Sequence, residues 1–144
     1  MAATAIVSMS YPKPRCSQEK IVKIVRTDTT AFVAAHLPRD AIISGLYVIG
    51  HAASNAVTTG VISVGTTATS DELIASYDVK TAATGEGYNP AGAAAVGTAL
   101  MTKLTADTPV YAKYAETGGA SSAGGPWFVK IEYFVTGAGE NAQI

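Results

Sequence analysis

The alternation of apolar and polar side chains along this chain constrains its fold more than any other feature. It is clearest near the C-terminus, where one set of side chains, Trp127, Val129, Ile131, Tyr133 and Val135, alternates with a second set, Phe128, Lys130, Glu132 and Phe134. Successive side chains of a strand point to opposite faces, so a period of two indicates β-structure. Because no useful stretch keeps the 3.6-residue period of a helix, the sequence predicts an all-β protein.

Eight segments carry strand patterns and are separated by turn residues: 21–26, 29–36, 41–51, 57–64, 73–79, 99–105, 110–115 and 127–135. About eight strands in 144 residues predict one antiparallel β-sandwich, jelly-roll-like in its architecture. The first two segments are separated by a short turn at Asp28, and we expect them to pair as a hairpin. Residues 41–51 are apolar on both faces, which predicts a position at the centre of the domain or in a subunit contact.

Three further segments are expected to lie outside the strands. Residues 1–20, with Pro12 and Pro14, predict an extended N-terminal arm, so the sandwich domain is expected to span residues 21–144. Residues 81–97 form a long loop, and the glycine-rich stretch 118–126 predicts an exposed, mobile tip that tolerates insertions.

Charge and composition exclude several kinds of chemistry. The net charge is -1, but the chain up to Arg39 holds six basic and two acidic residues. This excess fits either a basic arm that docks on an acidic neighbour or basic residues placed by chance on solvated faces. Cys16 has no disulfide partner, and with His36 and His51 it does not complete a zinc site. No nucleophile elbow or phosphate loop is present. We therefore expect no enzyme activity, cofactor or metal, no binding to nucleic acid or membrane, and synthesis in the cytoplasm.

The residues expected to contact a partner come from the arm and from two strands. Trp127 fits either a core aromatic or an anchor in an interface, because aromatic residues are enriched at binding hot spots. The predicted interface residues are Tyr11, Lys13, Arg15, Leu46, Tyr47, Val48 and Trp127.

Two segments resemble tailed-bacteriophage head decoration proteins, also called capsid cement proteins. They are LPRDAIISGLYVIGHAASNAVTTGVISVGTT, residues 37–67, and PVYAKYAETGGASSAGGPWFVKIEYFVTG, residues 109–137. The resemblance implies a jelly-roll-like structural protein of the virion, often a homotrimer, that binds the major capsid protein on the outer capsid surface and stabilises the shell. The alternative is a receptor- or glycan-binding β-sandwich of a fibre or adhesin, with Trp127, Tyr88 and the long loops forming its site.

Overall fold

The fold consists of β-strands alone in the part of the chain that the structure describes. This computed structural model describes residues 17–50, 52–81, 87–88 (by their backbone) and 102–136. The strands are β1 (Gln18–Ile24), β2 (Phe32–Leu37), β3 (Ala41–Gly50), β4 (Thr59–Gly65), β5 (Ile74–Asp78), β6 (Gly87–Tyr88), β7 (Thr108–Thr117) and β8 (Trp127–Val135). The prediction of an all-β chain is confirmed.

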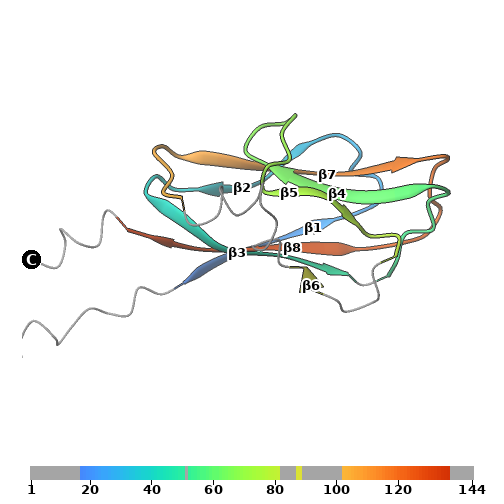
Figure 1. The fold of residues 1–144 in the computed structure, drawn as a ribbon, viewed down its shortest axis with the longest axis horizontal. Coiled ribbons are helices and arrows are strands. Elements are labelled where there is room, and N and C mark those ends of the chain that lie inside the picture. Colours follow the sequence, from blue (N-terminus) through green and yellow to red (C-terminus); the bar gives the residue numbers. More distant parts are fainter. Residues whose placement is uncertain (1–16, 51, 82–86, 89–101, 137–144) are drawn as a thin grey trace, which may run out of the picture.

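The strands form two stacked antiparallel sheets (Figure 1). Sheet I has the order β1-β8-β3-β6, and sheet II has the order β2-β7-β4-β5. The strand β6 has only two residues, so sheet I consists of three full strands and a short edge. The pairs β1–β8, β2–β7, β3–β6 and β4–β5 are those of one long hairpin with its tip between β4 and β5. Successive pairs of this hairpin lie in alternate sheets. The antiparallel pairing of β8 with β3 joins the two pairs of sheet I, and the pairing of β7 with β4 joins the two pairs of sheet II. This topology is a jelly roll, as the sequence predicts.

Alternate residues of the strands fill the core between the sheets. Trp127, Val129 and Ile131 of β8 are at most 1% exposed, and they face Ile62 and Tyr114 of sheet II, which are fully buried. The rings of Tyr114 and Trp127 stack with their centroids 5.2 Å apart. Burying such side chains is the dominant favourable contribution to folding, so the core follows directly from the alternation along the sequence.

A β-bulge in β3 changes which side chains of residues 41–50 face the core. The register against β8 shifts between Ile43 and Gly45, which reverses the alternation at that point. As a result Ile43, Leu46 and Val48 all face the core, whereas Tyr47 faces outward. Uninterrupted alternation along residues 41–51 predicts that Ile43 shares a face with Tyr47, and this prediction is wrong because of the bulge. The strand β3 lies inside sheet I, between β8 and β6.

The predicted hairpin between residues 21–26 and 29–36 is wrong. The strand β1 pairs with β8 and β2 pairs with β7, so the two lie in different sheets. The backbone N–H of Asp28 donates to the Val25 carbonyl at 2.9 Å, and the carbonyl of Asp28 accepts from Tyr114 N–H of β7 at 2.8 Å. This turn therefore carries the chain from sheet I to sheet II.

Three predicted boundaries also need correction. Gln18 to Lys20 were expected in the arm, but they pair with Tyr133 to Ile131 as the start of β1. Gly87 and Tyr88, expected in a loop, pair with β3 as β6. In the segment 99–105, Lys103 forms an isolated bridge with Ile42 in place of a strand, and residues 99–101 lie outside the described residues. The rest of the predicted arm, residues 1–16, also lies outside them.

Candidate interaction surface

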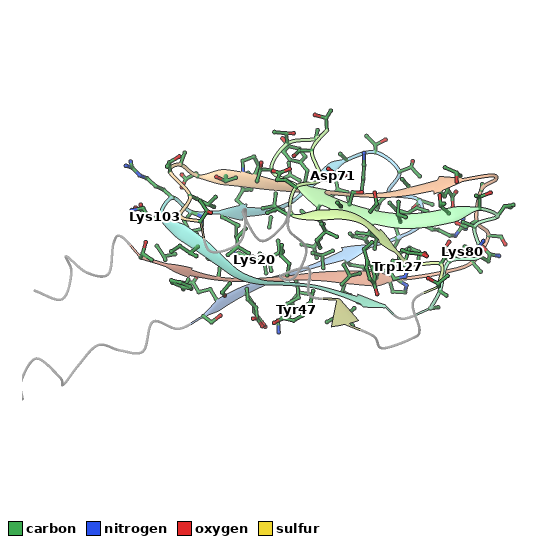
Figure 2. The ribbon with its side chains drawn as sticks, in the orientation of Figure 1. Lys20, Tyr47, Asp71, Lys80, Lys103 and Trp127 are labelled. Carbon is green, nitrogen blue, oxygen red and sulfur yellow. The ribbon has the colours of Figure 1, made fainter. Side chains whose placement is uncertain are left out.

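The predicted interface residues fall into three groups in the structure. Leu46 and Val48 are fully buried and Trp127 is 1% exposed, so their side chains belong to the core and the interface prediction is wrong for them. Tyr47 points away from sheet II, whereas Trp127 lies between the sheets (Figure 2). Tyr11, Lys13 and Arg15 lie outside the described residues. Only Tyr47 of the described residues in this set is placed to meet a partner.

Tyr47 belongs to a continuous surface formed by the side of sheet I that faces away from the core. We call this surface the outer face of sheet I. The strand registers place three kinds of side chain on it: aromatic residues Tyr47, Phe128 and Phe134, aliphatic residues Ile21, Ile42 and Ile49, and charged residues Glu19, Lys23, Lys130 and Glu132.

The side chains of the outer face of sheet I form rows across the strands. Lys23, Phe128 and Ile49 form one row, and Ile21, Lys130 and Tyr47 form the next. A third row, nearer the start of β1, contains Glu19, Glu132 and Gly45. Acidic residues therefore lie at one end of the face and Lys23 lies toward the other.

The apolar content of this face is unusual for a sheet surface in contact with water. An antiparallel sheet with one solvated face normally carries polar side chains there. Here Ile21 is 57% exposed and Ile49 is 38% exposed. Exposed apolar patches with polar residues among them mark sites of protein contact. The geometry therefore indicates a protein-binding surface.

The outer face of sheet II carries both polar and apolar side chains. Its register pairs include Thr59 with Thr117, whose hydroxyls lie 2.7 Å apart in a hydrogen bond, and Ser63 with Lys113. Val33, 43% exposed, and the partly exposed Val61 and Tyr111 lie on the same face. Sheet I carries two large exposed aliphatic side chains, Ile21 and Ile49, where sheet II carries Val33 alone among the described strand residues, and this difference favours sheet I as the binding side.

Charged side chains at the centre of the outer face of sheet I form ion pairs with one another. The ammonium of Lys130 lies 2.7 Å from Glu132 and 3.6 Å from Glu19, and 5.2 Å from the centre of the Tyr47 ring. The hydrogen bond to Glu132 and the charges of Glu132 and Glu19 raise the pKa of Lys130, against the opposing effect of desolvation. Two carboxylates surround one ammonium, so this cluster carries a net negative charge.

Gly45 accounts for the position of Tyr47 on this face. A Cβ atom on Gly45 would lie 2.9 Å from Cε2 of Tyr47 and 3.0 Å from Oε2 of Glu132. Both distances are shorter than ordinary van der Waals contacts. The missing side chain therefore leaves room for the Tyr47 ring beside Gly45, where it also lies near Lys130.

The loop between β7 and β8 was predicted to be an exposed and mobile tip. Gly118 to Ala120 are exposed as predicted, but hydrogen bonds hold the rest of the loop, against the expectation of a free tip. Asn55 accepts hydrogen bonds from the backbone N–H groups of Ser122 and Ala123, each at 2.9 Å, and its amide donates to the Ser122 hydroxyl. Arg26 donates to the Ser121 carbonyl at 2.7 Å, and Ser121 is 4% exposed. The loop is therefore attached to two other segments of the chain.

A polar cluster closes the sandwich under this loop. The hydroxyl of Tyr114 lies 2.7 Å from that of Ser54 and donates to Glu116 at 2.8 Å, while Ser121 N–H donates to the same carboxylate at 3.0 Å. Hydrogen bonds from Ser121 and Tyr114 lower the pKa of Glu116, with a smaller contribution from Arg26. Every group of this cluster has a partner, which is the arrangement expected of a structural contact.

The basic residues near the N-terminus do not form one patch. Arg26 binds the β7–β8 loop, at the end of the sandwich where Gly50 pairs with Trp127. Arg39 lies at the opposite end, where Ala41 pairs with Val135, and its backbone N–H donates to Asp107. Within the described residues, the basic side chains of this half are therefore spread over both ends of the sandwich, the outer face of sheet I at Lys23, and the edge strand β1 at Lys20.

The described ranges contain neither a metal-binding cluster nor a membrane-spanning helix. Residues 17–50, 52–81, 87–88 and 102–136 contain no cluster of three His, Cys, Asp or Glu side chains able to hold a metal ion. The same ranges contain no helix with the length and apolar character needed to cross a membrane.

Comparison with known proteins finds similarity of fold. No protein-family model matches this chain, and no curated protein matches it. It is similar to a chain of the cyanophage Pam1 capsid asymmetric unit, with a TM-score of 0.59 and 22% sequence identity over 84% of each chain. A chain of the acidic stable capsid structure of Helicobacter pylori bacteriophage KHP30 matches with a TM-score of 0.47 and 13% identity, over 83% of this chain and 94% of that one. The first match shows that the fold is shared with a chain of a phage capsid structure.

Proposed function

We propose that this chain is a structural protein of a bacteriophage virion that binds the outer surface of the capsid and stabilises the shell. The observation that carries the proposal is the fold shared over 84% of this chain with a chain of the cyanophage Pam1 capsid asymmetric unit. The resemblance of residues 37–67 and 109–137 to decoration proteins supports the same role. This role requires no catalysis, and we propose that the chain is not an enzyme.

The proposed partner is the major capsid protein, and the proposed state on the capsid is a homotrimer. The chain would be made in the host cytoplasm and would reach its place on the assembled particle. Many copies with a modest interface each can stabilise a shell, because attachment at several points raises the effective concentration of each contact. Binding to the assembled shell and not to its free subunits then favours the shell by mass action.

The alternative, a glycan-binding module, loses the residue on which it chiefly depended. Trp127 is 1% exposed and stacks on Tyr114 inside the sandwich, so its ring cannot serve as a platform for a sugar. The side chain of Tyr88 lies outside the described residues.

The proposed function is tested on particles of the virus that encodes the chain. Mass spectrometry of density-purified particles should find the chain in a fixed ratio to the major capsid protein. Its presence in the lysate together with its absence from the particles would contradict a virion role. Heating particles with and without the chain, with a dye that reports released DNA, tests stabilisation separately. Release at the same temperature in both samples would refute the stabilising role alone.

A further inference from the structure

We infer that the outer face of sheet I receives the N-terminal segment, residues 1–16, of a neighbouring copy of this chain. The inference goes beyond the virion role and does not depend on it, because it concerns contacts between copies of the purified protein. It rests on the pattern of the segment, the charges of the face, and the place where the segment joins the domain.

The sequence of the segment matches the character of the face. Val7, Met9 and Tyr11 are apolar and alternate with Ser8 and Ser10, so in an extended conformation the apolar side chains point to one side. Lys13 and Arg15 continue the same alternation. An extended strand with one apolar side is the form in which a peptide covers an apolar surface and leaves its polar side in water.

The charges of the segment and the face are complementary. Residues 1–16 contain two basic side chains and no acidic one. The row of Glu19 and Glu132 holds two carboxylates, with Lys130 of the next row as their shared cation. A basic side chain placed beside this row would balance the remaining negative charge. Complementary charges fix the register of a bound segment more than they raise its affinity.

The spacing of the segment also fits the spacing of the rows. Successive rows on the face are two residues apart along β1, from Glu19 to Ile21 to Lys23. With Lys13 beside the Glu19 row, Tyr11 reaches the row of Ile21 and Tyr47, and Met9 reaches the row of Phe128 and Ile49. Both chains are extended at about 3.3 Å per residue, so the match is kept over the length of the face.

The point of attachment favours a neighbouring copy over the chain's own face. The strand β1 begins at the end of the sandwich where β8 finishes (Figure 1), so residue 16 is joined to the domain at that end. To cover its own face, the chain would have to reverse between residues 15 and 17. A segment of 16 residues reaches roughly 55 Å, enough to cross to an adjacent domain without any reversal.

Disulfide trapping between full-length chains tests the inference. One chain carries Met9→Cys, the second carries Ile49→Cys and a tag of different mass, and both carry Cys16→Ser. After mixing and mild oxidation, the yield of the disulfide that joins a Met9→Cys chain to an Ile49→Cys chain should exceed the yields of the two dimers formed by identical variants. In the matched control, Val33→Cys replaces Ile49→Cys, because Val33 is exposed on the other sheet. Equal yields with Val33→Cys and Ile49→Cys would overturn the inference.

Two further measurements separate the remaining outcomes. A single chain with both Met9→Cys and Ile49→Cys, oxidised at high dilution, should not form an internal disulfide, and efficient internal closure would assign the segment to its own face. In sedimentation velocity, Ile49→Asp and Met9→Asp should each dissociate the oligomer, and the double variant should behave like either single one. Ile49 is exposed, so an unchanged circular dichroism spectrum shows that its variant is folded. An unchanged oligomer in the Ile49→Asp variant refutes the inference.

Discussion

Truncation of two neighbouring residues of β3, Leu46 and Tyr47, should have very different effects on stability. Leu46 is fully buried and is paired in register with Ile131, which is also fully buried. Leu46→Ala therefore removes methyl groups from a closed core and should cost about 3 kcal/mol. Tyr47 lies on the outer face, so Tyr47→Ala loses the contact with Lys130 and part of its packing, about 1 kcal/mol.

Urea unfolding followed by circular dichroism measures both changes. With a slope of about 2 kcal/mol per molar urea, the midpoint should fall by roughly 1.5 M for Leu46→Ala and roughly 0.5 M for Tyr47→Ala. Leu46→Met is the matched control, since it keeps the volume of the side chain and should cost about 1 kcal/mol or less. A larger loss for Tyr47→Ala than for Leu46→Ala would falsify the bulge, because without it the two side chains exchange faces.

Three other predictions concern the end of the sandwich that holds the β7–β8 loop. Tyr114→Phe removes the hydrogen bonds to Ser54 and Glu116 and should cost about 2 kcal/mol in thermal or urea unfolding, with no loss expected if the cluster is absent. Gly124→Ala should destabilise the fold, because φ is +133° and the new Cβ would lie 2.7 Å from Cα of Ser54; Ala120→Ser in the same loop, at an exposed position, should leave the melting temperature unchanged. Because the folded pKa of Glu116 is lowered, its contribution to stability is fully present above the ordinary pKa of a glutamate and is lost as the pH falls through the lower folded pKa. Glu116→Gln should therefore show a smaller fall in urea midpoint between pH 7 and pH 3, and an identical fall would contradict the assignment.

Most strands could be predicted from the sequence because they follow from local alternation, whereas the two-residue strand β6 carries no such pattern. β8 was located with correct limits, since Trp127 to Val135 alternate without interruption. The order of strands could not be predicted in the same way, because pairing depends on contacts between distant segments. Residues 21–26 and 29–36 look like a hairpin locally, yet β1 pairs with residues more than one hundred positions away.

The candidate surface was only partly visible in the sequence. Leu46, Tyr47 and Val48 were assigned together because residues 41–51 are apolar on both faces, so alternation alone does not say which face meets the core; the structure places Tyr47 outward and buries Leu46 and Val48. Phe128 and Phe134 did carry a signal: they alternate with the buried residues of β8, so their position on the outer side follows from the pattern alone.

The β7–β8 loop shows a second limit of sequence interpretation. Its glycines and serines are typical of a mobile tip, and four of its glycines have positive φ angles. The loop is held in one conformation by Asn55 and Arg26, which are distant in sequence and form hydrogen bonds with its backbone. Composition shows which conformations a loop can adopt, whereas its partners decide which one it keeps.

The central claim, that this jelly roll is a structural protein on the surface of a virion, is tested most directly by electron cryomicroscopy of particles from the virus that encodes it. An eight-stranded sandwich is expected outside the capsid floor, and the residues of β1 to β8 should fit it with side-chain density. A shell whose outer density is fully explained by other chains, in particles purified from cells that make this protein, would contradict the claim.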